Sequence, residues 1–223
     1  AIEHLPPVPN VIFMAGRKFG TAGSEDLTWA MNTLVPANVA DRFQASRIVA
    51  FSTGCVYPLV PVDSGGSTEM DSPDPTGEYA QSCLGRERVF QFFSQRRGTA
   101  ALLFRLNYAI DLRYGVLHDL ACRIWNNQVV DLTMGHVNVI WQGDACRIAL
   151  RALEHCSTPA ALLNVTGQQT LCVRNLAERL GELLDRPVPP ATTPAPTALL
   201  SNASKATSLF RPPQPALATQ LRW

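Results

Sequence analysis

Residues 47–54 read Arg47-Ile-Val-Ala-Phe-Ser-Thr-Gly54, a mainly apolar run that ends in two hydroxyl side chains and a glycine. Three other stretches have the same form, Val11 to Ala15, Ala100 to Leu106 and Ala161 to Val165. Runs without polar alternation are typical of strands that are covered on both faces, as in a parallel sheet. The sequence therefore predicts four strands of a buried parallel sheet.

Segments with helical character separate these runs. They span roughly Asp26 to Phe43, Glu78 to Arg96, Asp144 to His155 and Val173 to Leu184, and the last has the clearest apolar spacing. Strands that alternate with helices in this way indicate βαβ units and a doubly wound α/β sheet. From Arg186 onward five prolines within eleven residues predict an extended connector, followed by a short tail to Trp223.

The composition excludes several classes of function. Nineteen basic and eighteen acidic side chains leave a net charge of +1, so no basic surface for nucleic acid or an anionic membrane is expected. No run of eighteen apolar residues and no signal-peptide pattern occurs, so we expect a cytoplasmic protein without a membrane partner. The six cysteines show no metal-ligand spacing, so we expect reduced thiols and no metal site.

Three glycines, Gly16, Gly20 and Gly23, follow the first predicted strand. They could form a phosphate-binding loop, but their spacing is GxxxGxxG instead of GxGxxG. In addition, Ser52 and Thr53 stand at the end of the next strand, where a dinucleotide site has an acidic residue for the ribose. We prefer an ordinary strand-to-helix turn.

A hydroxyl at the carboxyl end of a strand, Thr53, is followed 26 residues later by Tyr79 at the start of a helix. This pattern resembles the extended short-chain dehydrogenase/reductase family, the NAD-dependent epimerases and dehydratases. Further segments resemble the same family in the same order: Val11 to Gly16, Asn32, Arg105-Leu106-Asn107, His136-Val137 with Asp144-Ala145, Leu163 to Gly167, and Ser204-Lys205-Ala206.

The resemblance implies an incomplete Rossmann-like, doubly wound parallel sheet with a small C-terminal substrate-side subdomain. Residues 1–167 would be the C-terminal part of an NAD(P)-binding domain, with 111–135 contributing to the substrate pocket. Residues 168–223 would supply a helix and a proline-rich substrate-side unit. The family's glycine-rich loop and first three strands are not in this sequence, so we expect an N-terminally truncated piece or an edge covered by another chain. Either way, this chain alone should bind NAD or NADP weakly or not at all.

The family's chemistry is reversible hydride transfer on nucleotide-linked or similar sugars. In that resemblance Tyr79 exchanges a proton with a substrate oxygen, and Thr53 hydrogen-bonds the same oxygen. The residues implied at the cofactor are Ala15, Gly16, Asn32, Tyr79, Asn107 and Tyr108. Those implied at the substrate are Thr53, Asn107, Arg113 and Tyr114. Thr53 could instead bond its local backbone, and Tyr79 could be a structural aromatic.

One position departs from the family pattern. Cys83 stands where the Tyr-x-x-x-Lys motif has a lysine that acidifies the phenol and holds the nicotinamide ribose. A thiol is normally neutral at pH 7, so another cation would have to act on Tyr79. Lys18 is the first candidate, within about 6 Å of the phenol oxygen, and Arg86 is the second. Both could equally be solvated surface charges.

Two alternatives to an active oxidoreductase remain open. The chain could be a catalytically impaired relative that serves as a dinucleotide- or ligand-binding regulatory module, which Cys83 favours. Cys83 could also be a nucleophile, although none of the four histidines is its neighbour in sequence. A homodimer is expected only by analogy with the family.

Overall fold

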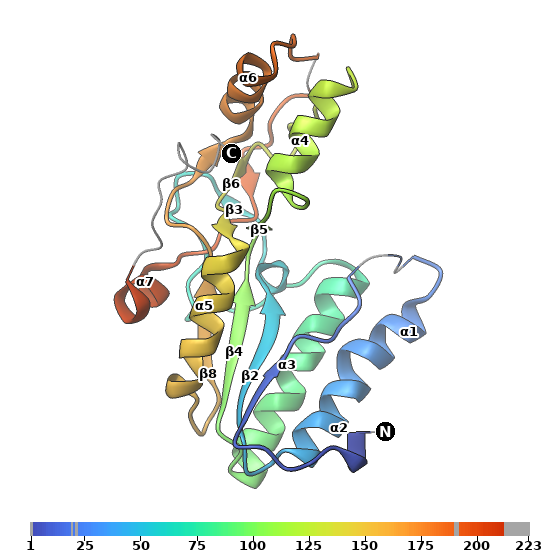
Figure 1. Cartoon of the computed structure of the whole chain (residues 1–223), viewed down its shortest axis with the longest axis vertical. Helices are drawn as coiled ribbons and strands as arrows, with labels where there is room; N and C mark the ends of the chain where they lie inside the picture. The colour runs from blue at the N-terminus through green and yellow to red at the C-terminus, as the bar shows by residue number, and fades with distance from the viewer. Residues whose placement is uncertain (1, 19, 21, 190–191, 212–223) are drawn as a thin grey trace.

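The computed structural model describes residues 2–18, 20, 22–189 and 192–211. Its central sheet has four parallel strands in the order β1 (Asn10–Phe13), β2 (Arg47–Thr53), β4 (Ala101–Leu106) and β8 (Ala161–Val165) (Figure 1). The predicted parallel sheet is therefore confirmed. Strand β1 is shorter than its apolar run, because Met14 and Ala15 leave the sheet and are exposed.

Helices connect these strands much as the sequence predicts. Between β1 and β2 the chain forms α1 (Glu25–Trp29), the π-helical segment η2 (Ala30–Leu34) and α2 (Val35–Arg42). A π turn here is reasonable because Pro36 has no amide hydrogen for the regular helical bond. The other predicted helices are α3 (Gly77–Arg97), α5 (Gln142–Ala152) with η4 (Leu153–His155), and α6 (Val173–Leu184).

Both faces of the sheet are covered, which explains the unalternated apolar runs. On one face Ile48 and Ala50 of β2 pack with Phe90 of α3 and with residues of α2. On the other face Val49 and Phe104 belong to a cluster with residues of α5. In Figure 1, α3 and α5 accordingly lie on opposite sides of the sheet.

A second lobe lies beyond the carboxyl ends of the strands (Figure 1). Its core joins α4 (Val116–Trp125), which the sequence analysis did not predict, to α6. Short strands complete this region: β5 (Ala109–Ile110), β6 (His136–Val137), β7 (Ile140–Trp141) and β9 (Leu171–Cys172). The lobe thus combines two chain segments, one before and one after β8. The proposed division at residue 167 separates these segments, and it remains a proposal.

The remaining elements are small. They are η1 (Ile2–His4), η3 (Gly54–Val56), the antiparallel pair β3 (Val60–Pro61) and β10 (Thr197–Ala198), and α7 (Ser204–Phe210). The predicted tail, residues 212–223, and Pro190 lie outside the described residues. None of the helices in the described ranges combines the length and apolarity that crossing a bilayer demands.

The glycines after β1 have a conformational explanation. Gly20 and Gly23 have φ angles of +63° and +74°, a region that side-chain-bearing residues rarely adopt. Both precede α1 in the strand-to-helix turn. The turn geometry thus accounts for these two glycines without a phosphate ligand.

Candidate functional site

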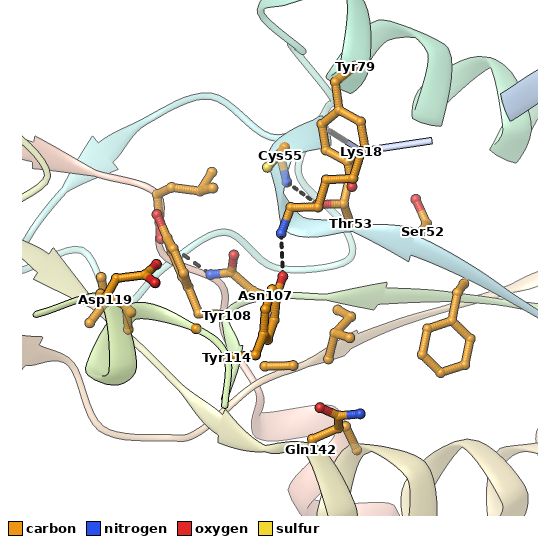
Figure 2. Close-up of a pocket in the computed structure, with 18 of the residues that line it drawn as sticks. Lys18, Ser52, Thr53, Cys55, Tyr79, Asn107, Tyr108, Tyr114, Asp119 and Gln142 are labelled. Atoms are coloured by element: carbon orange, nitrogen blue, oxygen red, sulfur yellow. Dashed lines mark hydrogen bonds between the residues drawn. The ribbon is translucent and has the colours of Figure 1, made fainter. Parts of the chain in front are cut away.

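A cavity of about 730 Å³ lies between the carboxyl ends of the sheet strands and the second lobe. This is where ligands bind in open parallel sheets. The sequence-predicted site residues that line it are Gly16, Lys18, Thr53, Tyr79, Asn107, Tyr108 and Tyr114. Figure 2 shows several of these side chains reaching into one space from separate elements.

Thr53 and Tyr79 meet on the sheet side of this cavity. Thr53 ends β2, and its hydroxyl accepts a 3.1 Å hydrogen bond from the Cys55 amide, which caps η3. The Tyr79 phenol, from the first turn of α3, lies next to the Thr53 side chain (Figure 2). Thr53 therefore has both the local backbone contact and the contact with the phenol that the sequence analysis considered.

The surroundings of Tyr79 keep its phenol protonated. Burial raises its pKa well above the ordinary value of 10, the nearby Cys83 side chain raises it further, and the Thr53 side chain lowers it. No cation of the described residues is among these main causes. At neutral pH the Tyr79 side chain is therefore a neutral phenol, which can donate a hydrogen bond, and its phenolate is disfavoured.

Lys18 contacts Tyr114. Its ammonium donates a 3.0 Å hydrogen bond to the hydroxyl of Tyr114 and lies 5.7 Å from the centre of that ring. Tyr114 stands just before α4, so the contact joins the loop after β1 to the second lobe across the cavity (Figure 2).

Three of the predicted residues do not line the cavity. Asn32 is fully buried and holds the loop after β1, since its side chain accepts from the Arg17 amide at 2.9 Å and donates to the Arg17 carbonyl at 3.0 Å. The Arg113 side chain is 87% exposed and pairs with Asp111. Ala15 is also exposed, beside Gly16.

Asn107 and Tyr108 lie where β4 ends. The Asn107 amide donates to the side chain of Asn138 at 2.9 Å and to the carbonyl of Leu199 at 3.3 Å, so it ties the sheet to the second lobe. Tyr108 has a φ of +41°, and burial raises its pKa to about 12. Both residues border the cavity: Asn107 with an amide that is already hydrogen-bonded, and Tyr108 with a neutral phenol.

A buried ionic network fixes the strand that carries Thr53. Glu87 of α3 binds Arg105 of β4 through both carboxylate oxygens, at 2.9 and 2.7 Å, and accepts a 2.5 Å hydrogen bond from Ser52. Arg105 also donates to the hydroxyl of Tyr57, which in turn donates to Asn164 of β8. The network therefore links α3, β2, β4 and β8 immediately below the cavity.

The cavity has lining residues that the sequence analysis missed. They are Cys55 in η3, Asp119 and Arg123 on α4, and Gln142 and Cys146 on α5. The signal for α4 was present, since Val116, Leu117, Leu120 and Ile124 have helical spacing. Among the described residues no group of three or more His, Cys, Asp or Glu side chains could hold a metal ion.

Comparison with known proteins gives a likeness of fold. The sequence matches no family model and no curated protein. Among solved structures, UDP-glucuronic acid 4-epimerase from Bacillus cereus, in complex with NAD, is 16% identical with a TM-score of 0.83, over 96% of this chain and 72% of that one. RMD from Pseudomonas aeruginosa, complexed with NADPH, is 20% identical with a TM-score of 0.82, over 99% and 82%.

A third solved structure is a double mutant of the dTDP-glucose 4,6-dehydratase DesIV from Streptomyces venezuelae, with NAD bound. It is 17% identical with a TM-score of 0.82, over 99% of this chain and 73% of that one. The protein thus has the Rossmann-like α/β fold of these enzymes. At such low identity the likeness concerns the fold, and the activity must be argued from the cavity.

Proposed function

We propose that this protein is an NAD(P)-dependent oxidoreductase of the epimerase/dehydratase type that acts on a hydroxyl or carbonyl group of a nucleotide-linked sugar. The observation that carries the proposal is the proximity of Thr53 and Tyr79, which line the cavity together at the carboxyl edge of the parallel sheet. Structures of the same fold with bound NAD, NADPH or nucleotide sugars support it.

The residues on the sheet side of the cavity fit the nicotinamide end of a dinucleotide. Gly16 is exposed at the cavity wall, and Met14 and Phe51 supply apolar surface for a ring. When bound there, the nicotinamide supplies or accepts a hydride. The sequence has no GxGxxG motif for the pyrophosphate, so we expect weak binding by this chain alone.

Thr53 and Tyr79 would handle the reacting oxygen. Thr53 donates a hydrogen bond that holds this oxygen in place, and Tyr79 gives its proton to the oxygen of a carbonyl that is being reduced. Both directions pass through the Tyr79 phenolate, which forms when a carbonyl is reduced and acts as the base when an alcohol is oxidised. Burial of Tyr79 disfavours this form in either direction.

The test combines binding and turnover. NADH and NADPH fluorescence is titrated with the purified protein, and a panel of UDP- and dTDP-linked sugars and 4-keto sugars is then followed by chromatography. We expect turnover in the wild type and a loss of about 100-fold or more in Tyr79→Phe, with cofactor affinity retained. A Tyr79→Phe protein as active as the wild type would exclude Tyr79 as the acid/base.

The second candidate is a catalytically impaired, ligand-binding regulatory module. It is favoured by the buried Cys83 thiol in place of a cation, because burial keeps its pKa raised and the group neutral. Cofactor binding without turnover on the whole panel would support this alternative. A homodimer and a cytoplasmic location belong to the main proposal, and light scattering on the purified protein tests the dimer.

A further inference from the structure

Arg86 is a buried guanidinium beside the cavity. Its residue is 6% exposed, and the side chain lies 5.7 Å from the ring centre of Phe13. One terminal nitrogen donates to the carbonyl of Phe51 at 2.8 Å, and the other donates to the side chain of Asn32. Its Nε atom is buried and has no hydrogen-bond partner in the part of the chain that the structure describes. The sequence analysis considered Arg86 as a surface charge or a second cation for Tyr79.

The charge of Arg86 has no counter-charge among the described residues. Its neighbour in sequence, Glu87, is committed to Arg105, and that pair is almost fully buried. The adjacent Cys83 thiol does not supply a negative charge either, since burial raises its pKa by more than Arg86 lowers it. A buried and unpaired cation is costly, so its presence calls for an anion from outside the chain.

The position of Arg86 indicates where such an anion would bind. The guanidinium lies directly against Gly16, because a Cβ added there would come within 2.2 Å of Nη2. Arg86, Gly16 and Ser52 all line the cavity on its sheet side. The glycine thus lets a cation reach the cavity wall between β1 and β2.

We infer that Arg86 is the anion-binding residue of this cavity and that it receives the phosphoryl oxygens of the bound dinucleotide. A guanidinium suits this task because its planar donors match two oxygens of one phosphate, and its charge is fixed. The dinucleotide itself rests on the proposed function. The requirement for an oxyanion rests on Arg86 alone.

The experiment separates a binding role from a structural one by comparing two buried arginines. Arg86→Gln and Arg105→Gln each remove one charge, but only Arg105 has a carboxylate partner. We expect Arg105→Gln to lower the melting temperature strongly. We expect Arg86→Gln to melt at or above the wild-type temperature while its affinity for NADH and for inorganic pyrophosphate falls at least about tenfold. Arg86→Lys should retain part of this affinity.

Unchanged affinity of Arg86→Gln for NADH and pyrophosphate would overturn the inference, and so would a wild type that binds neither probe. If Arg86→Gln does not fold, Asn32→Asp is the second variant, since a carboxylate beside Nη2 supplies the counter-charge. It should weaken pyrophosphate binding, and unchanged binding there also overturns the inference. The inference and the proposed function can also be separated. If Arg86→Gln loses pyrophosphate binding and the wild type turns over no nucleotide sugar, the inference is supported and the proposed function fails.

Discussion

The ion pair of Glu87 and Arg105 should be one of the largest single contributions to stability that a point mutation can remove. Glu87 is fully buried, Arg105 is 2% exposed, and the carboxylate accepts three hydrogen bonds, two of them from the guanidinium. Glu87→Gln leaves the Arg105 charge buried and unpaired, which costs about 3–5 kcal/mol. The free energy of unfolding of a protein domain is about 5–15 kcal/mol, so this loss is a large share of it.

Urea denaturation followed by circular dichroism at pH 7 measures this loss. In thermal denaturation the same loss should lower the melting temperature by roughly 6–20 °C, because each kcal/mol corresponds to about 2–4 °C in a protein of this size. The matched control is Glu182→Gln, which removes an exposed pair with Arg179 and should cost less than about 1 kcal/mol. A loss in Glu87→Gln no larger than in Glu182→Gln would refute the view that burial makes this pair indispensable.

Three further predictions concern the cavity. Cys83→Lys places an ammonium one turn after Tyr79, which should lower the phenol pKa by about 1–3 units and increase turnover at pH 7; unchanged turnover would show that the cation is not what limits the site. Burial raises the pKa of Tyr108 to about 12, above the unfolded value near 10. Stability from this group is therefore complete below pH 10 and should fall by about 2 kcal/mol between pH 10 and 12. Urea denaturation between about pH 10 and 12 should show that the free energy of unfolding falls less steeply with pH in Tyr108→Phe than in the wild type. Equal slopes in the two proteins would contradict the raised pKa of Tyr108. Gly16→Ala would displace the guanidinium of Arg86, so its NADH affinity should fall about tenfold in a fluorescence titration, whereas wild-type affinity would mean that Arg86 can shift freely.

Much of the fold follows from short-range patterns. The four apolar runs predicted the sheet because each strand is buried on both faces, as Val49 and Ala50 illustrate by packing into opposite clusters. The second lobe did not follow, since its core depends on contact between α4 and α6, which are separated by the whole of α5 and β8. Periodicity identifies an apolar face but does not identify its partner.

The candidate site was predictable to a similar extent. The resemblance to the epimerase/dehydratase family implied that Thr53 and Tyr79 face one site, and the parallel-sheet prediction placed Thr53 at the carboxyl edge, where such sites lie. The partners of charged side chains were not predictable. Lys18 reaches Tyr114 from 96 residues away, and Arg86 is buried because a glycine without a side chain leaves it space. Such contacts depend on tertiary packing, which no local spacing encodes.

The two-segment construction of the second lobe limits how the cavity can be remodelled. The polypeptide passes between the sheet and that lobe near Asn107, near Ile140, near Gly167 and again before α7, so no single cut releases the lobe. It cannot be transplanted as a cassette from one protein to another, nor swing on one hinge. Diversification of the cavity must instead come from individual replacements along its wall, each of them made within a fixed outline.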